Sequence, residues 1–267
     1  MEAKAGDETT PKKYSAVRYV SVAEEMNARC RTSMEDAHIF EDAFDGRESS
    51  ALFGVFDGHG GREVVEFVSK RFPDVLKQEL RSGKPMAEVW TASYLATDLE
   101  SRKAGHESGC TAATCLVRKE GGRKMLHTAN VGDSRVVLCS GRKALRLTKD
   151  HKATSEEEKT RIEGRGGFVL RGRVCGMLAV SRSFGDHGLK DYVSARPYTN
   201  ETMLTDEDTF AIVACDGLWD VIDDQEAVDF VRQRISDRRV SGTARALVQQ
   251  ALSRGSTDNI SVVVVFF

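Results

Sequence analysis

The sequence predicts an α+β fold built on largely antiparallel sheets, and two observations carry that prediction. Helical and strand-like segments come in grouped runs, whereas strict alternation of strands and helices would indicate a parallel sheet. Short turn signals separate consecutive strand-like segments, as is typical of antiparallel neighbours. The chain has 267 residues, 40% hydrophobic and 30% charged, which is enough for a full core. No linker or repeat divides it, so we expect one domain over residues 14–267 after a flexible lead-in over residues 1–13.

The first part of the chain predicts a strand followed by two amphipathic helices. The apolar run LFGVF (52–56) is typical of a strand. A helix is expected near 61–81, broken or kinked at Pro73, because proline removes a backbone donor. A second helix is expected near 84–103, where Pro85 suits a helix start.

The middle of the chain predicts a strand-rich region. Turn signals GDS and SG favour an antiparallel meander of four strands, over 111–119, 124–131, 135–140 and 143–148. A helix then opens near residue 154, where Ser155 and Glu158 have capping-box spacing. The glycine- and arginine-rich stretch 164–176 is expected to be an irregular loop.

The last part of the chain predicts two strands and two helices between them. The strands are TFAIVAC (209–215) and NISVVVVFF (259–267). The helices are expected near 224–235 and 243–254, and the second ends against Gly255, a residue type typical of helix C-termini.

Composition and charge exclude several classes of function. A formal net charge of −2 gives no electrostatic reason to expect a nucleic-acid or membrane partner. No stretch approaches the ~18 apolar residues that span a bilayer. The opening residues lack the apolar core of a signal peptide, and Glu2 excludes N-myristoylation. The six scattered cysteines form no C-x-x-C pair and indicate reduced thiols. We therefore expect a soluble protein of the cytoplasm, the nucleus or both.

Carboxylates recur where apolar segments begin or end. Asp57 ends LFGVF, Asp216 ends AIVAC, and Asp258 precedes NISVVVV. If the last strand is antiparallel to its neighbours, these three residues can meet at one sheet edge. Glu35 and Asp36 precede a further apolar segment. Each acid alone is more simply a turn residue or helix N-cap, but the repetition of Asp-Gly after apolar runs favours a shared site.

Crowded carboxylates repel and raise one another's pKa, and a hard divalent cation removes that penalty. Sets of oxygen ligands suit Mg²⁺ or Mn²⁺. Because no cluster of cysteine or histidine has the spacing of a zinc site, we expect one of these two ions.

Eight motifs resemble those of the metal-dependent protein phosphatases of the PP2C (PPM) family, in the family's order and from about residue 18 to 267. They are RTSMEDAH (31–38), VFDGHGG (55–61), SGCTA (108–112), ANVGDSR (129–135), LTKDHK (147–152), LAVSRSFGD (178–186), ACDGLWD (214–220) and STDNIS (256–261). The set is far more specific than any single motif.

The resemblance implies a four-layer αββα sandwich, in which helices flank two antiparallel sheets and a metal centre lies at one end. It implies hydrolysis of phosphoserine and phosphothreonine in proteins by a water activated at two Mg²⁺ or Mn²⁺ ions, without a phosphoenzyme. Asp57 would bridge the ions, the Gly58 carbonyl would bind one, and Asp216 and Asp258 would ligate the second. Two further acids, Glu35 and Asp36, would act largely through metal-bound waters.

The remaining assignments also come from the resemblance. Asp133 and Asp220 fall where the family can hold a weaker third metal ion. Arg31 matches the residue that grips the substrate phosphate, and His59 matches the proposed general acid. Because residues two apart in an extended segment point the same way, Asp57 and His59 could face one site. A flap of about residues 164–200 would border that site.

Competing functions are weaker. A cysteine-based phosphatase needs arginine six positions after the cysteine, and no cysteine here has it. The glycine-rich motifs of kinases and P-loop NTPases are absent. The remaining alternative is a pseudophosphatase, the same fold used only as a binding module. We expect a monomer acting on phosphorylated proteins. A weaker hypothesis makes Cys30 a reactive thiol, because it adjoins Arg31.

Overall fold

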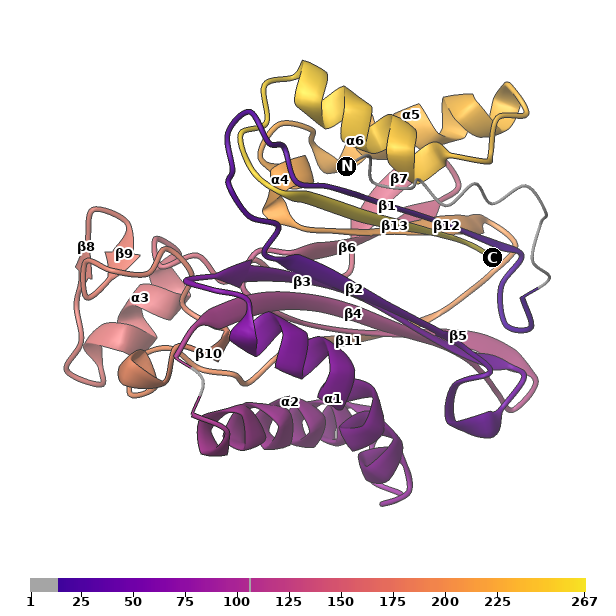
Figure 1. Ribbon diagram of the computed structural model, residues 1–267. Helices are drawn as coiled ribbons and strands as arrows, with labels where there is room; N and C mark the ends of the chain where they lie inside the picture. The colour runs from indigo at the N-terminus through magenta and orange to yellow at the C-terminus, as the bar shows by residue number, and fades with distance from the viewer. Residues whose placement is uncertain (1–13, 106) are drawn as a thin grey trace.

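Two antiparallel sheets are stacked face to face, with helices on both outer faces, in the computed structural model (Figure 1). The structure describes residues 14–105 and 107–267, so the lead-in expected over 1–13 lies outside the described residues. The expected α+β fold of antiparallel sheets flanked by helices is confirmed.

One sheet has five strands in the order β1-β13-β12-β6-β7, and every neighbouring pair is antiparallel. In that order the strands are β1 (Tyr19–Glu25), β13 (Ile260–Phe266), β12 (Asp208–Ala214), β6 (Arg135–Ser140) and β7 (Lys143–Arg146). Every residue of the interior strand β13 is buried, which is consistent with its sequence, apolar at every position except Ser261.

The other sheet has six strands. Its main path is β11 (Tyr198–Met203), β5 (Arg123–Val131), β4 (Gly109–Glu120), β3 (Ser50–His59) and β2 (Asp36–Asp42). The sixth, β10 (Phe184–Gly185), pairs with the beginning of β4.

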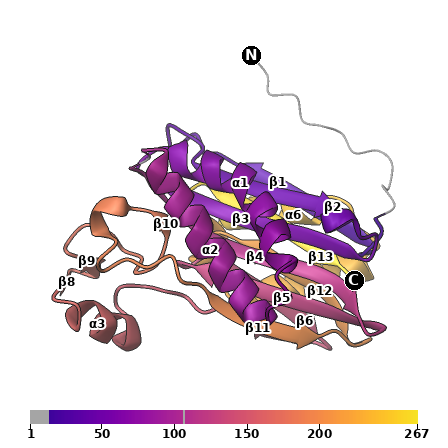
Figure 2. The ribbon, with the colours of Figure 1, turned by 90° about the horizontal axis from the view of Figure 1, so that it is seen from below.

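The helices form the two outer layers. The first pair, α1 (Glu63–Leu80) and α2 (Met86–Lys103), lies across the six-stranded sheet (Figure 2). The five-stranded sheet is covered by α4 (Asp216–Trp219), α5 (Asp224–Ser236) and α6 (Thr243–Ser253). A separate lobe at one end of the sandwich contains α3 (Glu156–Glu163) and the hairpin of β8 (Val169–Leu170) and β9 (Arg173–Val174). Among the described residues, no helix has the length and apolar character needed to cross a bilayer.

Alternation along the strands builds three apolar layers. On β3, Phe53 and Val55 pack between the two sheets, whereas Leu52 and Phe56 pack against α1 and α2. Successive strand residues point to opposite faces, so a strand covered on both sides must be apolar at every position. The sequence LFGVF meets that requirement. It allows β3 to lie between the apolar layer that separates the sheets and the apolar layer under α1 and α2.

Two local expectations are wrong for tertiary reasons. Of the break or kink expected at Pro73 in the helix near 61–81, the break is wrong, because α1 runs from Glu63 to Leu80 as one helix. Pro73 is buried beside Phe72 and Leu76, and packing of this apolar face stabilises the helix despite the missing donor. The stretch 164–176 is not wholly irregular, because it contains the β8–β9 hairpin.

The predicted meander is correct for the pairs β4–β5 and β6–β7 and wrong between them. The turn at 132–134 carries the chain from one sheet to the other. The edge of β5 that a hairpin partner would take is paired with β11, and β6 pairs with β12. This crossing puts Asp133 at the junction of the two sheets.

Candidate metal centre and active site

Acidic residues from both sheets meet at one end of the sandwich. Asp36 opens β2 and lies directly opposite Asp57 of β3 in the strand register. From the other sheet, Asp216 follows β12 and begins α4, and Asp258 precedes β13. Most predicted site residues line one pocket of about 240 Å³, namely Arg31, Asp57, Gly58, His59, Asp133, Asp216 and Asp258. The expected convergence of Asp57, Asp216 and Asp258 is present, but the expectation of a single sheet edge is wrong, because Asp57 comes from the six-stranded sheet and the other two come from the five-stranded sheet.

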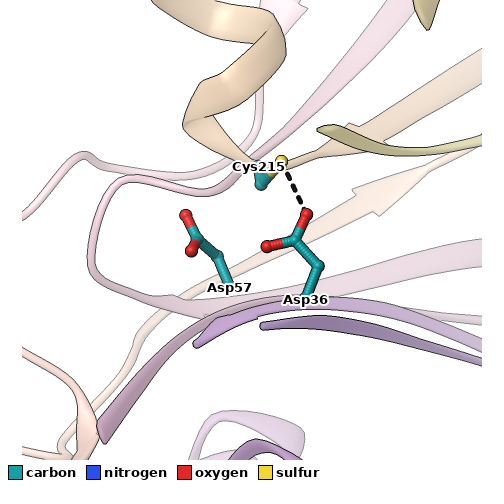
Figure 3. Close-up of side chains that lie close together, drawn as sticks. All are labelled: Asp36, Asp57 and Cys215. Carbon is teal, nitrogen blue, oxygen red and sulfur yellow. Dashed lines mark hydrogen bonds between the residues drawn. The ribbon is translucent and has the colours of Figure 1, made fainter. Parts of the chain in front are cut away.

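Asp36, Asp57 and Cys215 form a tight group of potential ligands. One side-chain atom from each lies within 4.8 Å of the others. Figure 3 shows the two carboxylates rising from adjacent strands toward Cys215 at the end of β12. The Cys215 thiol donates a hydrogen bond to Asp36 Oδ2 over 3.3 Å. Sequence reasoning gave Cys215 no role, although it directly precedes Asp216 in the ACDG motif.

The electrostatics of the group favour a bound cation. Burial, with repulsion from Asp36 and Asp216, raises the pKa of Asp57 well above its usual value. Burial, with repulsion from Asp133 and Asp258, raises the pKa of Asp216 to about 7. Burial likewise raises the pKa of Asp36 to about 6, although the Cys215 hydrogen bond opposes this. Within residues 14–105 and 107–267, the salt bridges of this region reach Asp258, Asp133 and Asp220, and none reaches Asp36, Asp57 or Asp216.

Two buried oxygens test whether a metal ion fits. Asp36 Oδ1 and Asp216 Oδ1 are buried and have no hydrogen-bond partner within the described part of the chain. Buried polar atoms without partners are rare because leaving them unpaired is costly. Oxygen ligands of this kind suit Mg²⁺ or Mn²⁺, so the residues fit the implied ions. The Cys215 thiol is a donor rather than a ligand, because burial and the nearby Asp36 and Asp57 raise its pKa well above the usual value.

Both Asp-Gly pairs of the site need glycine for close packing of backbone. A Cβ atom on Gly58 would lie 2.3 Å from the Glu35 carbonyl oxygen, and one on Gly217 would lie 2.0 Å from the Asn259 carbonyl oxygen. Such distances are impossible, so a side chain at either position would push the ligand-bearing segments apart. The repeated Asp-Gly pattern therefore reflects the joining of segments distant in sequence.

Asn259 is a second residue that sequence reasoning missed. Its Oδ1 accepts a hydrogen bond from the Glu35 backbone over 2.8 Å, and its Nδ2 donates to the Met26 and Ser33 carbonyls. These bonds fix the 26–35 loop, and hence Glu35 and Arg31, beside the beginning of β13. The Glu35 carboxylate itself accepts from Ser33 and is not part of the tight group.

Arg31 lies at the mouth of the pocket beside Asp258. Its Nη2 donates to Asp258 Oδ2 over 2.5 Å, and its side chain is 48% exposed. A guanidinium in this position can reach both solvent and the pocket, which suits contact with an incoming anion.

The two residues assigned to a third metal ion flank a lysine. Lys152 Nζ lies 3.5 Å from Asp133 Oδ2 and 3.4 Å from Asp220 Oδ1. Asp133 is buried, whereas Asp220 is largely exposed. The ammonium group neutralises this pair, so a cation binding there would have to compete with it.

His59 ends β3 and lines the same pocket as Asp57, as the two-residue spacing predicts. Its Nε2 lies 2.8 Å from Asp186 Oδ2, a contact that the sequence did not indicate. Asp186 belongs to the LAVSRSFGD motif, which is 127 residues away in sequence.

Comparisons with known proteins give a consistent result. Residues 20–260 match the family model for protein phosphatase 2C. The chain is 42% identical to protein phosphatase 2C homolog 1 of Schizosaccharomyces pombe over 249 residues, 91% of this chain and 71% of that protein. It is 39% identical to protein phosphatase 2C homolog 1 of Saccharomyces cerevisiae over 269 residues, 95% of each. The crystal structure of serine-threonine phosphatase 2C from Toxoplasma gondii superposes with a TM-score of 0.82 at 25% identity, covering 96% of each chain.

Proposed function

The chain belongs to the protein phosphatase 2C family, and on that premise we propose that it hydrolyses phosphoserine and phosphothreonine residues of proteins by direct attack of water. The observation that carries the proposal is the pocket in which carboxylates of both sheets meet Arg31 and His59. Phosphoryl transfer needs charge stabilisation and positioning more than a reactive side chain, and this pocket offers both.

The acidic residues are the proposed metal ligands. Asp57, the Gly58 carbonyl, Asp216 and Asp258 would hold two Mg²⁺ or Mn²⁺ ions, with Glu35 and Asp36 acting indirectly. Asp133 and Asp220 would hold a weaker third ion. When bound, such ions lower the pKa of a water molecule and neutralise the phosphoryl oxygens.

The other side chains act on the substrate. The Arg31 guanidinium would bind the phosphoryl oxygens through charge-assisted hydrogen bonds. His59 would give a proton to the departing serine or threonine oxygen, which is otherwise a poor leaving group. Burial raises the pKa values of the Cys110 and Cys215 thiols well above normal. Neither is then a thiolate nucleophile, which favours direct hydrolysis without a phosphoenzyme.

The proposal includes the setting of the reaction. The substrates would be phosphorylated proteins, and the enzyme would act as a monomer in the cytoplasm or nucleus. The alternative, a binding module without turnover, is less consistent with the four aspartates that line the pocket together with Arg31 and His59.

Mn²⁺-dependent hydrolysis of a phosphothreonine peptide tests the proposal. We expect turnover with Mn²⁺, its loss with EDTA, and near-complete loss in Asp57→Asn and Asp216→Asn with the fold retained. Asp206→Asn is the matched control, because Asp206 is exposed and outside the pocket. Folded, metal-saturated wild-type protein without turnover would instead identify a binding module.

A further inference from the structure

Asp186 and His59 form a partly buried hydrogen-bonded pair at the pocket. His59 Nε2 lies 2.8 Å from Asp186 Oδ2 and 3.0 Å from Oδ1. The Asp186 side chain is only 11% exposed, and Ser183 Oγ donates to the same Oδ2 atom. The Ser183 hydroxyl therefore fixes the Asp186 carboxylate, and the carboxylate in turn fixes the His59 imidazole.

Strand pairing brings the two residues together. His59 lies opposite Gly109 where β3 pairs with β4, and Gly185 lies opposite the same Gly109 where β10 pairs with β4. Asp186 follows β10 directly, so docking of this two-residue strand determines where the carboxylate lies. The position is not intrinsically favourable, because Asp186 has φ 49° and ψ 39°, a left-handed conformation that costs roughly 1 kcal/mol for a non-glycine residue.

Gly109 provides the space for the pair. A Cβ atom on Gly109 would lie 2.2 Å from Asp186 Oδ2 and 2.4 Å from His59 Nε2. Gly109 is not among the residues with positive φ, so its backbone conformation does not require glycine. Glycine is required instead because a side chain would occupy the space that the two side chains fill. The left-handed backbone of Asp186 and the absence of a side chain at Gly109 are therefore both needed for the contact between Asp186 and His59.

From this geometry we propose that Asp186 is a positioning residue for His59, an inference that rests on the proposed phosphatase function. With Nε2 bound to Asp186, Nδ1 is the nitrogen left for the substrate. It has no hydrogen-bond partner among the described residues, and the ring is 31% exposed on the pocket. Asp186 acts through His59 and does not touch the substrate.

With His59 Nε2 bonded to Asp186, every proton and electron pair of the hydrolysis step can be accounted for. As the water oxygen bonds to phosphorus it releases a proton to solvent, the bond from phosphorus to the serine or threonine oxygen breaks, and the electron pair of that bond stays on the departing oxygen. The oxygen takes the proton from His59 Nδ1. The ring is then neutral and keeps its other proton on Nε2, still donated to Asp186. Solvent returns a proton to Nδ1 before the next turnover. A carboxylate that fixes the tautomer and orientation of a catalytic imidazole is well established in other hydrolases.

Two substrates with different leaving groups test the inference. A threonine alkoxide needs a proton on departure, whereas the nitrophenolate of p-nitrophenyl phosphate does not. We expect Asp186→Ala to lower kcat for a phosphothreonine peptide about 10- to 100-fold, part of the usual contribution of acid catalysis. KM for the peptide and kcat for p-nitrophenyl phosphate should change less than about threefold. Asp206→Asn is the control for both substrates.

A double-mutant cycle separates positioning from an independent effect. His59→Gln should show the same preference for p-nitrophenyl phosphate, and adding Asp186→Ala should cause no further loss. Gly109→Ala, which keeps both side chains and fills their space, should reproduce the pattern. Equal loss on both substrates, additivity with His59→Gln, or no loss at all would each overturn the inference. Asp186→Asn, which preserves the side-chain shape, replaces Asp186→Ala if the latter does not fold.

A spectroscopic measurement does not depend on activity. In ¹H–¹⁵N spectra of the metal-free protein, the proton on His59 Nε2 should be observable and should disappear in Asp186→Ala. Its absence from the wild-type spectrum would overturn the inference even if the enzyme is active. Wild-type protein that shows this proton but hydrolyses neither substrate would contradict the phosphatase proposal while leaving the pair intact.

Discussion

The Cys215 thiol and the Asp36 carboxylate join the two sheets at the metal centre, with Sγ 3.3 Å from Oδ2 (Figure 3). Cys215 directly follows β12 of the five-stranded sheet, and Asp36 begins β2 of the six-stranded sheet. The thiol stabilises the charged form of a buried carboxylate that has an unpaired second oxygen.

Replacing Cys215 with alanine should therefore weaken metal binding. Loss of the donor makes Asp36 harder to ionise, and we expect apparent Mn²⁺ affinity to fall about fivefold, corresponding to about 1 kcal/mol for one hydrogen bond. Titration calorimetry measures this directly. Cys115→Ala is the control, because Cys115 is equally buried in the same apolar layer but burial alone, without any carboxylate, raises the pKa of its thiol. Equal affinities in the two variants would rule out the role given to the thiol.

Replacing Asp216 with asparagine should stabilise the metal-free protein. The variant removes one charge from a group of buried carboxylates that repel one another. In EDTA we expect a melting temperature about 3 °C or more above wild type, as a gain of about 1 kcal/mol would produce. Added Mn²⁺ should then stabilise wild type more than the variant. A lower melting temperature in EDTA would show that Asp216 has a stabilising contact that the structure does not reveal.

Arg31→Ala should weaken substrate binding more than metal binding. A charge-assisted hydrogen bond is worth about 1.5–3 kcal/mol, so KM for a phosphopeptide should rise about 10-fold or more. The KM of Arg31→Lys should lie between those of wild type and Arg31→Ala, since lysine keeps the charge but cannot make a bidentate contact. Steady-state kinetics at saturating Mn²⁺ measures the change, with Arg29→Ala as a neighbouring exposed control. An unchanged KM would contradict a role in substrate binding and would reduce the function of Arg31 to its ion pair with Asp258.

Glu158 should make the protein sensitive to acid. Burial alone would raise the pKa of Glu158, but hydrogen bonds from Arg182 and Ser181 and the charge of Arg182 lower it to about 2. The folded pKa lies below the unfolded value, so the contribution is present above pH 4.5 and is lost as pH falls toward 2. Its size is about 3 kcal/mol.

Urea unfolding at a series of pH values checks this expectation. Glu158→Gln should be less stable than wild type at pH 7 and should lose less further stability between pH 4.5 and 2. Glu157→Gln is the control, since its side chain is largely exposed on the same helix. Parallel pH curves for wild type and Glu158→Gln would contradict the assignment.

Features carried by local sequence were predictable. Asp57, Asp216 and Asp258 could be grouped because each adjoins an apolar strand. Antiparallel pairing of β12 with β13 places Asp216 and Asp258 at one end of their sheet. Asp57 joins them from the other sheet, through a stacking of the sheets that the strand pattern did not predict. The Ser155 N-cap was also predictable, because its Oγ accepts from the Glu158 backbone as the spacing predicts. The reciprocal bond of a capping box is missing because the Glu158 side chain is taken by Arg161 and Arg182.

Features that depend on docking of distant segments were not predictable. Asp186 reaches His59 only because β10 pairs with β4, and two residues give no recognisable strand pattern. Asn259 acquires its role from backbone groups more than 220 positions earlier. The effect of Pro73 was also not predictable from local sequence. Proline would end an isolated helix, but packing of the buried face of α1 stabilises the helix through Pro73.

The division of the acidic residues between two sheets has a consequence for unfolding. No strand of one sheet pairs with a strand of the other anywhere in residues 14–105 and 107–267. Away from the pocket the sheets adhere through apolar side chains. Cations held by Asp57 on one side and Asp216 on the other would cross-link the two halves at one end only. At high metal concentration the two sheets would then separate first at the end away from the pocket. The metal ions that serve catalysis would thus also determine which end of the sandwich unfolds first.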